Sequence, residues 1–334
     1  MLQKIVGILV FISAGSALAE AGTLAEAGTL AEAGTLAEAG TLAEDSCQPS
    51  KWGPDDEIGN VNLISPETVL KASKLIKTGK TYSLGITIDS NTPAFPPRSL
   101  SLMVVQPGQQ EGARPLGINT YNDDVFFGWF GIGSQIDGLG HLGTDGMYYN
   151  CNRSEDFAEL TGLTKLGIEK VPPIVARGVV LDMASHFGVD VMEAGKFFTV
   201  ADVKAVAKRQ NTPIRKGDVV LFHTGWTDAK LQSDPDAWVA AEPGQSEEVA
   251  QYLADLDVVA VGADTWGVDV VPPQFADRPY QGHVILLKEN GIYILETMNT
   301  GPLVRDGAYE FLFVLGQAKV RGAVQMIINP IAIH

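Results

Sequence analysis

The spacing of hydrophobic and polar residues predicts a chain of alternating helices and strands. Helices are marked by a polar capping residue, by apolar residues three or four positions apart, and by a glycine or polar residue at the end. Three segments show these signals: 65–79, 199–210 and 246–256. In the second, Thr199 and Asp202 have the spacing of a capping box, so we expect the helix to begin directly after Thr199.

Shorter apolar or alternating runs predict strands. They occupy residues 81–88, 175–183, 218–222, 258–261, 292–295, 311–315 and 324–328. Two of them, 175–183 and 218–222, are apolar enough to lie centrally in a sheet. We therefore expect an α/β or α+β protein with a substantial mixed sheet flanked by helices.

Composition indicates the size of the folded body and the kind of partner. The chain has 334 residues, of which 45% are hydrophobic and 19% charged, as is typical of a globular protein. No second linker follows residue 46, so we expect one domain over 46–334. The net charge of −16 argues against nucleic acid and anionic membranes as partners, and it favours a small-molecule ligand.

The N-terminal part of the chain carries targeting and repeat signals. Residues 1–19 combine one cation, a short apolar run and small residues at the end, which predict a signal peptide cleaved after Ala19. The alternative is a retained anchor, but the apolar run is short for a bilayer. Residues 20–45 contain a repeated EAGTLA unit, which we interpret as an acidic tether. We therefore expect a secreted or periplasmic protein.

The chain has two cysteines, Cys47 and Cys151, which are too few for a disulfide framework and form no CxxC motif. In an exported protein they can pair with each other. Such a bond would tie the N-terminal segment to the body.

Candidate chemistry is concentrated in the glycine-rich segment 131–146. Six glycines exclude a stable helix there, so we expect Asp137 and His141 on a tight loop. A carboxylate and an imidazole are ligand types that Zn²⁺ and Mn²⁺ accept. For this spacing alone the alternative is structural, with an aspartate that caps a turn and a histidine bonded to a carbonyl group.

Other residues are weaker candidates for the same site. His223 ends an apolar strand and is expected to be a buried structural residue, with the replacement of a missing metal ligand as the alternative. Asp264 and Trp266 are candidates for a pocket wall, although an aspartate after a buried strand also forms turns. Four aromatic residues are expected in the core, with a stacking wall for a planar substrate as the alternative: Phe126, Phe127, Trp129 and Phe130.

Six motifs occur together in one order along the chain. They are the segments 52–64, 131–141, 177–182, 224–226, 262–266, and 282–283 with 295–296. In this order they resemble the cyclase-family metal hydrolases, the group that contains bacterial kynurenine formamidase and isatin hydrolase. The resemblance covers essentially the whole chain after the repeat. It implies a swivelling β/β/α fold, hydrolysis of an amide, lactam or ester at a divalent metal, and a homodimer or tetramer.

The family signature, H-x-G-T-H-x-D-x-x-x-H, aligns with the glycine-rich segment. Its last two ligands match Asp137 and His141, whereas Gly131 and Gln135 stand where the family has histidines. Ser134 stands at the threonine position. The loss of two imidazoles argues against a two-metal centre.

Two downstream residues complete the implied site. Glu296 matches the late carboxylate ligand of the family, and His283 matches a histidine that acts as acid/base or as an additional ligand. The resulting hypothesis is one Zn²⁺ or Mn²⁺ ion held by Asp137, His141 and Glu296, with Gln135 as a neutral oxygen ligand.

In this hypothesis the remaining residues carry out the chemistry. His283 exchanges protons with the attacking water and the leaving group, and Ser134 or nearby N–H groups orient the substrate or bind the oxyanion. A catalytic triad on Ser134 is less favoured because the serine is not in a G-x-S-x-G elbow. The alternative function is a small-molecule-binding protein on the same scaffold, without catalysis.

Overall fold

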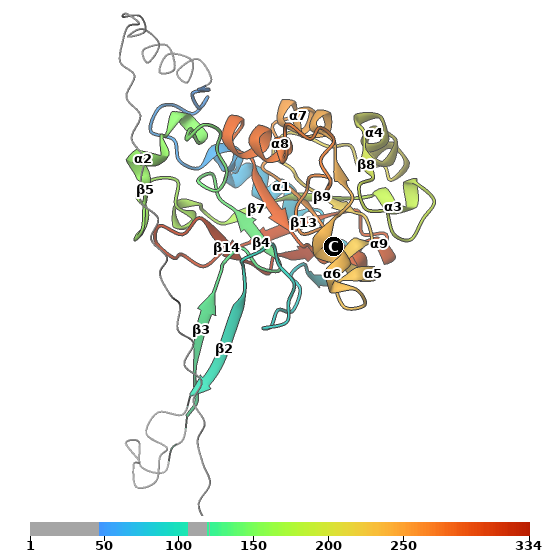
Figure 1. Cartoon of the computed structure of the whole chain (residues 1–334). Helices are drawn as coiled ribbons and strands as arrows, with labels where there is room; N and C mark the ends of the chain where they lie inside the picture. The colour runs from blue at the N-terminus through green and yellow to red at the C-terminus, as the bar shows by residue number, and fades with distance from the viewer. Residues whose placement is uncertain (1–46, 106–118, 120) are drawn as a thin grey trace, which may run out of the picture. The chain divides into compact units, whose positions relative to one another are not determined.

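The computed structural model of the chain describes residues 47–105, 119 and 121–334 (Figure 1). These residues belong to one compact unit, Asp45–His334. The predicted signal peptide (1–19) and all of the predicted tether (20–45) lie outside the described residues. In the part that the structure describes, every helix is too short or too polar to cross a membrane.

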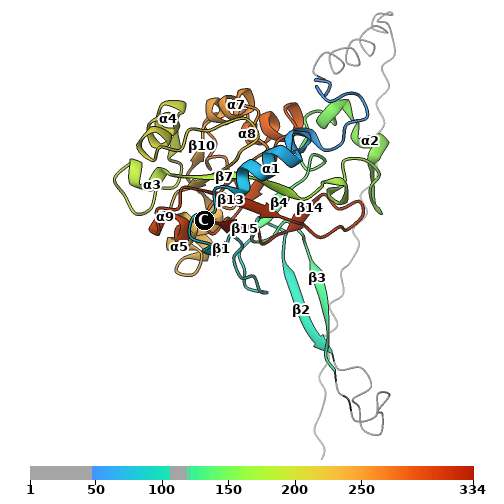
Figure 2. The ribbon, with the colours of Figure 1, turned by 180° about the vertical axis from the view of Figure 1, so that it is seen from behind.

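A nine-stranded mixed sheet forms the centre of the unit, in the order β1-β15-β13-β7-β9-β11-β12-β4-β14. In that order the strands are Thr81–Ser83, Ile331–Ile333, Glu310–Leu315, Ile174–Asp182, Val219–His223, Ala260–Ala263, Tyr293–Glu296, Gln135–Asp137 and Gln325–Ile327. The four central strands, β7, β9, β11 and β12, are parallel, and the pairs at both ends are antiparallel. The sheet and its flanking helices confirm the predicted α/β fold class (Figures 1 and 2).

Helices and smaller strands complete the unit. The α-helices are α1 (Pro66–Ser73), α2 (Ser154–Phe157), α3 (Met183–His186), α4 (Val200–Arg209), α5 (Trp226–Lys230), α6 (Pro235–Ala240), α7 (Glu247–Asp255), α8 (Gln281–His283) and α9 (Gly301–Arg305). Shorter helical turns are η1 (Gly59–Leu63), η2 (Tyr149–Cys151), η3 (Ile168–Lys170) and the π-helical η4 (Val284–Glu289). Three two-stranded sheets pair β2 (Leu100–Val105) with β3 (Asp123–Gly128), β5 (Ala158–Glu159) with β6 (Gly162–Leu163), and β8 (Phe197–Phe198) with β10 (Gly244–Gln245).

Local sequence signals account for most of these elements. Thr199 accepts a hydrogen bond from the Asp202 amide and Asp202 accepts one from the Thr199 amide, which confirms the predicted capping box. The two runs predicted to be central are β7 and β9, and Val219–Phe222 is fully buried. The predicted strand over 81–88 is shorter, because only its first three residues, β1 at the edge of the sheet, pair with the neighbouring strand β15.

The β2–β3 ribbon extends away from the rest of the unit in both views (Figures 1 and 2). Most of its apolar side chains are exposed, with Phe127 at 75% and Phe126 at 44%, whereas Leu100 at its start is buried. Trp129, directly after the ribbon, is 42% exposed, and only Phe130 packs against the core. The prediction that all four aromatic residues lie in the core was therefore wrong, because an aromatic β-run in a two-stranded ribbon has no layer to cover it.

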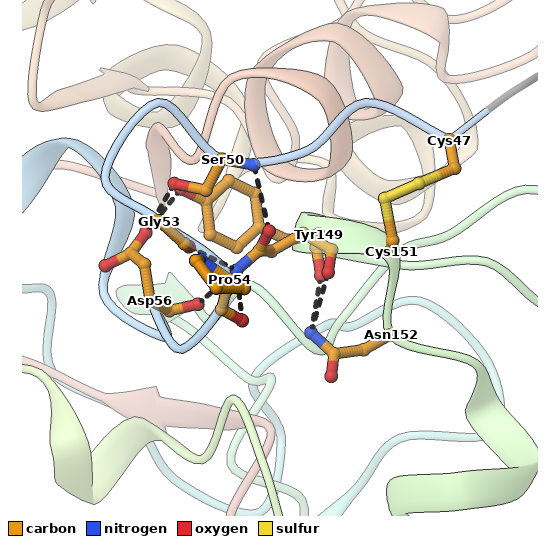
Figure 3. The surroundings of a disulfide bond; sticks show 9 residues. Cys47, Ser50, Gly53, Pro54, Asp56, Tyr149, Cys151 and Asn152 are labelled. Atoms are coloured by element: carbon orange, nitrogen blue, oxygen red, sulfur yellow. Dashed lines mark hydrogen bonds between the residues drawn. A yellow bond between two sulfur atoms is a disulfide. The ribbon is translucent and has the colours of Figure 1, made fainter.

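The predicted pair of cysteines forms a disulfide, Cys47–Cys151 (Figure 3). Hydrogen bonds also join the segment that follows Cys47 to the segment around Cys151. Asn150 accepts a hydrogen bond from the Ser50 amide at 2.8 Å, and its own amide donates to the Asp56 carbonyl at 2.9 Å. Tyr149 donates its hydroxyl proton to Asp56 Oδ2 at 2.6 Å. The segment after the tether is thus part of the folded body.

Candidate metal centre

Two neighbouring strands bring together the carboxylates of the site. In the antiparallel pair β4–β12, Gln135 lies opposite Glu296 and Asp137 lies opposite Ile294. Alternate residues of a strand share one face, so Gln135 and Asp137 project toward the same side as Glu296. Asp137 therefore lies in a short buried strand, and the prediction that it lies on a loop was wrong. His141 does lie in the loop that follows.

A third side chain reaches the same place from α8. The Asp269 carboxylate accepts a hydrogen bond from the His283 amide at 3.1 Å, and the same oxygen lies 2.9 Å from His283 Nδ1. A Cβ atom at Gly282 would lie 1.9 Å from Asp269 Oδ1, so only glycine permits this approach. With Nδ1 bound to Asp269, His283 Nε2 faces Glu296 Oε1 at 3.3 Å and Asp137 Oδ2 at 3.9 Å.

Asp137, His283 and Glu296 form a buried cluster in which one ligand atom from each lies within 4.8 Å of the others. Burial and the charge of Asp137 raise the pKa of Glu296. Burial alone would lower the pKa of His283, but Asp269 and Glu296 raise it well above its usual value. Among the described residues, Asp137 Oδ2 has no hydrogen-bond partner. Because an unpaired buried carboxylate oxygen is costly, the donor set fits a divalent cation.

Two glutamine amides hold the other oxygen of Asp137. Gln135 Nε2 donates to Asp137 Oδ1 at 3.1 Å and to Glu296 Oε2 at 2.5 Å. Gln325 Nε2 donates to Asp137 Oδ1 at 2.6 Å. Since its nitrogen faces the carboxylates, Gln135 positions them here and does not offer the oxygen ligand that we expected. Gln325 carries no motif and was missed by the sequence analysis.

His141 lies at the edge of the cluster. Its Nε2 is 3.9 Å from Asp137 Oδ2, but it is not part of the group whose ligand atoms all lie within 4.8 Å of one another. Its side chain is 22% exposed and lines the adjacent pocket, whereas that of His283 is 6% exposed. Burial lowers the pKa of His141, which favours the neutral imidazole.

Ser134 is buried and directly precedes β4. Its hydroxyl donates to the Thr297 carbonyl at 2.6 Å and accepts from the Ile86 amide at 2.9 Å. The residue is 1% exposed. A hydroxyl bonded in this way holds two chain segments together, and the structure gives no support to its predicted contact with substrate.

Glu242 is a further buried carboxyl group that the sequence analysis missed. Both of its oxygens accept from the Gly267 amide, at 3.0 and 3.1 Å. Burial raises its pKa well above the usual value, and the charge of Glu296 adds to this effect. Glu242 therefore favours its neutral form beside the pocket.

The cluster opens into a pocket of about 140 Å³ whose wall is partly aromatic. The pocket is lined by Phe95, Arg98, His141, Leu142, Trp266, Gly267, Tyr280, His283 and Glu296. Trp266 packs against Phe95 with ring centroids 5.8 Å apart. Trp266 thus lines the pocket, as predicted, and a flat apolar group fits this wall.

Asp264 and His223 belong to a separate structural pair. Asp264 accepts from the Thr224 and Gly225 amides, both at 2.8 Å, so it stabilises a turn and does not line the pocket. His223 Nδ1 lies 3.1 Å from Asp264 Oδ2 and 2.8 Å from Thr300 Oγ1. The structural interpretation of His223 is confirmed.

Replacement of His223 by glutamine is expected to destabilise the protein more at pH 6 than at pH 9. Burial opposes the charged form of His223, but Asp264 raises its pKa above the usual value. Because the pKa is raised in the folded state, this stabilisation is complete below the unfolded-state pKa of about 6.5 and is lost as the pH rises through the folded-state pKa. Urea unfolding should show a loss of about 2 kcal/mol at pH 6. An equal loss at pH 9 would contradict a charged pair.

Comparison with known proteins identifies the family to which this fold belongs. The architecture is a mixed α/β sheet that carries a buried Asp–His–Glu cluster at the wall of an aromatic pocket, and it defines a candidate metal-site protein. The family model Cyclase matches residues 82–270. The chain belongs to the cyclase family, as its motifs indicated. A comparison with curated protein sequences gave no match.

Solved structures share the fold over most of the chain. A novel cyclase is 31% identical, with a TM-score of 0.77, and the match covers 85% of this chain and 96% of that one. An isatin hydrolase bound to the product analogue thioisatinate is 17% identical, with a TM-score of 0.57, covering 80% and 98%. Isatin hydrolase A from Ralstonia solanacearum is 18% identical, with a TM-score of 0.58, covering 76% and 91%.

Proposed function

We propose that the protein is a metal-dependent hydrolase that cleaves an amide, lactam or ester bond of a small cyclic or aryl compound. The observation that carries the proposal is the convergence of Asp137, His283 and Glu296 at the wall of an aromatic pocket. The shared fold of isatin hydrolases supports this reaction class, although it does not select a substrate.

In this proposal Asp137, His283 and Glu296 hold the cation. Asp137 offers the unpaired Oδ2, and His283 offers Nε2 because Asp269 engages Nδ1. A carboxylate behind a histidine is a common way to fix its ring orientation at a metal. A divalent cation such as Zn²⁺ or Mn²⁺ would supply Lewis acidity for the scissile carbonyl and would lower the pKa of water.

The two histidines exchange the roles that the sequence suggested. Both line the pocket, but His283 belongs to the buried cluster, whereas His141 is more exposed, and burial lowers its pKa, which favours the neutral imidazole. We assign His141 as the residue that takes a proton from the attacking water and returns it to the leaving group. Phe95 and Trp266 orient the planar part of the substrate, and neutral Glu242 keeps the Gly267 backbone in place.

Metal content and turnover test this function together. Protein purified without chelator is expected to contain about one divalent ion per chain and to hydrolyse formanilide, isatin or an aryl lactone. Inductively coupled plasma mass spectrometry measures the metal, and chelation followed by addition of Zn²⁺ or Mn²⁺ measures its effect on rate. Ligand binding without metal or turnover would instead identify a binding protein on the same scaffold.

We also propose that the mature protein is exported, with the signal peptide removed after Ala19. The Cys47–Cys151 disulfide supports this compartment, because such bonds persist in oxidising environments. The proposal is tested by N-terminal sequencing of the protein from the extracytoplasmic fraction.

We propose that the chain forms a homo-oligomer by self-association through the β2–β3 ribbon. Apolar side chains on both of its faces are exposed, among them Leu102, Met103 and Phe127. The ribbon and Trp129 together present several exposed apolar side chains, a surface of the kind that a partner covers in a stable interface. A second copy of the chain presents the same apolar surface, and a two-fold interface joins identical surfaces of two copies.

Replacement of Phe127 by serine is therefore expected to shift the protein toward the monomer. Light scattering after size-exclusion chromatography should give at least twice the chain mass for the wild type and a lower mass for Phe127→Ser. Leu160→Ser is the matched control, because Leu160 is fully exposed and lies outside the ribbon. A monomeric wild type would exclude the arrangement.

A further inference from the structure

One permanent positive charge stands in the pocket wall. Of the described residues that line the pocket, Arg98 is the only lysine or arginine. Its Nη1 donates to the Gly131 carbonyl at 2.9 Å, which anchors one end of the guanidinium group. A guanidinium group has five N–H donors, so this bond leaves most of its donor capacity available.

The position of Arg98 depends on the glycine at residue 131. A Cβ atom there would lie 2.8 Å from Arg98 Nη1 and 2.6 Å from Gln325 Oε1. Any side chain at 131, a histidine included, would displace Arg98 or Gln325. Gly131 therefore leaves room for the guanidinium group of Arg98 and the amide of Gln325 at this point.

The charge of Arg98 is not neutralised by a salt bridge within the described part of the chain, where no carboxylate oxygen lies within 4.0 Å of it. Arg98 lines the same pocket as His141, Tyr280 and Glu296. The guanidinium group thus acts on the space that a ligand would fill.

We propose that Arg98 binds the carboxylate of an aromatic substrate whose ring lies against Phe95 and Trp266. Arg98 follows Phe95 closely in the chain, and its amide donates to the Phe95 carbonyl at 3.0 Å, so the cation and one of the two aromatic rings belong to one segment. Guanidinium and carboxylate groups match in shape and charge, and their paired hydrogen bonds are stronger than neutral ones. The scissile group would then face the Asp137–His283–Glu296 cluster.

Arylcarboxylates are therefore the favoured substrate class. That such compounds are hydrolysed rests on the proposed hydrolase function, whereas their binding to Arg98 does not. Binding is tested by calorimetry with benzoate and with its neutral isostere benzamide, on wild-type protein, Arg98→Gln and Arg98→Lys of equal metal content. We expect the wild type to prefer benzoate by about 10- to 100-fold. Arg98→Gln should lose this preference, and Arg98→Lys should keep part of it.

A matched control and two opposing outcomes make the test decisive. Arg305→Gln removes one exposed positive charge outside the pocket and should keep the preference, which excludes an effect of net charge. Equal weakening of benzoate and benzamide in Arg98→Gln would show that Arg98 only supports the Gly131 loop and would overturn the proposal. Unchanged affinity of Arg98→Gln for both benzoate and benzamide, with the preference intact, would assign the carboxylate to the metal and would overturn it as well.

Turnover separates this inference from the proposed function. With 2-formamidobenzoate and formanilide as paired substrates, Arg98→Gln should raise KM about 10-fold or more for the first alone. If neither substrate is hydrolysed while benzoate binding depends on Arg98, the carboxylate site stands and the hydrolase proposal fails. If both substrates are hydrolysed and Arg98→Gln changes neither KM, the hydrolase proposal stands and the carboxylate site fails.

Discussion

Replacement of His283 by alanine is expected to abolish stoichiometric metal binding and to lower kcat/KM by about 10³-fold or more. The imidazole supplies Nε2 to the buried cluster, 3.3 Å from Glu296 Oε1, and Asp269 fixes its ring. Without it, two carboxylates would face each other in a buried space with one cation ligand fewer. Two like charges close together in a buried space are unfavourable, and the loss of one ligand weakens the binding of the cation.

The metal content of dialysed His283→Ala, measured by mass spectrometry, checks this prediction together with its kcat/KM. His186→Ala serves as the matched control, because His186 pairs with Asp202 at 2.9 Å and does not line the pocket. The control should keep its metal and its rate. A His283→Ala protein that binds one ion per chain with unchanged affinity would refute the ligand assignment.

The fold was predictable from the sequence where each element carries its own signal. The capping box of α4 and the β-branched runs of β7 and β9 determine their structure locally, and both central strands are buried as their apolar composition requires. Neither strand of the β2–β3 ribbon was predicted, and its aromatic residues were expected in the core. Whether an apolar strand lies in the core or projects from it depends on what packs against it, and a single sequence does not contain that information for Phe127.

The site was predictable in part for a similar reason. Asp137, His283 and Glu296 stand in motifs that resemble a known family, so their convergence could be expected. Gln325 has no such motif, and it reaches Asp137 across 188 residues of sequence only because β14 pairs with β4. A long-range register of this kind follows from the assembled sheet and not from any local pattern.

The roles of the two histidines also depend on tertiary contacts. Either imidazole offers the chemistry of a ligand or of a base. His283 is distinguished by Asp269, fourteen residues earlier in the chain, which binds both its amide and its ring. His141 is distinguished by its partial exposure to the pocket. Neither feature is visible in the spacing of the sequence.

Replacement of His141 by glutamine is expected to leave the metal in place and to lower kcat by about 10²- to 10⁴-fold. Glutamine has a similar size and still forms hydrogen bonds, but it does not accept and return a proton at neutral pH. His141 contacts the cluster only at 3.9 Å from Asp137 Oδ2, so its loss should leave the three buried ligand atoms together. Because Phe95 and Trp266 still orient the substrate, KM should change only a few-fold.

The comparison of His141→Gln with His283→Ala decides between the two possible assignments. Metal content separates them, since the first variant should retain about one ion per chain and the second should not. A loss of metal in His141→Gln as large as that in His283→Ala would make His141 a ligand, as its spacing from Asp137 first suggested. Retained metal with unchanged kcat would show that another group moves the proton, and the half-buried phenol of Tyr280 in the same wall would then be the next residue to replace.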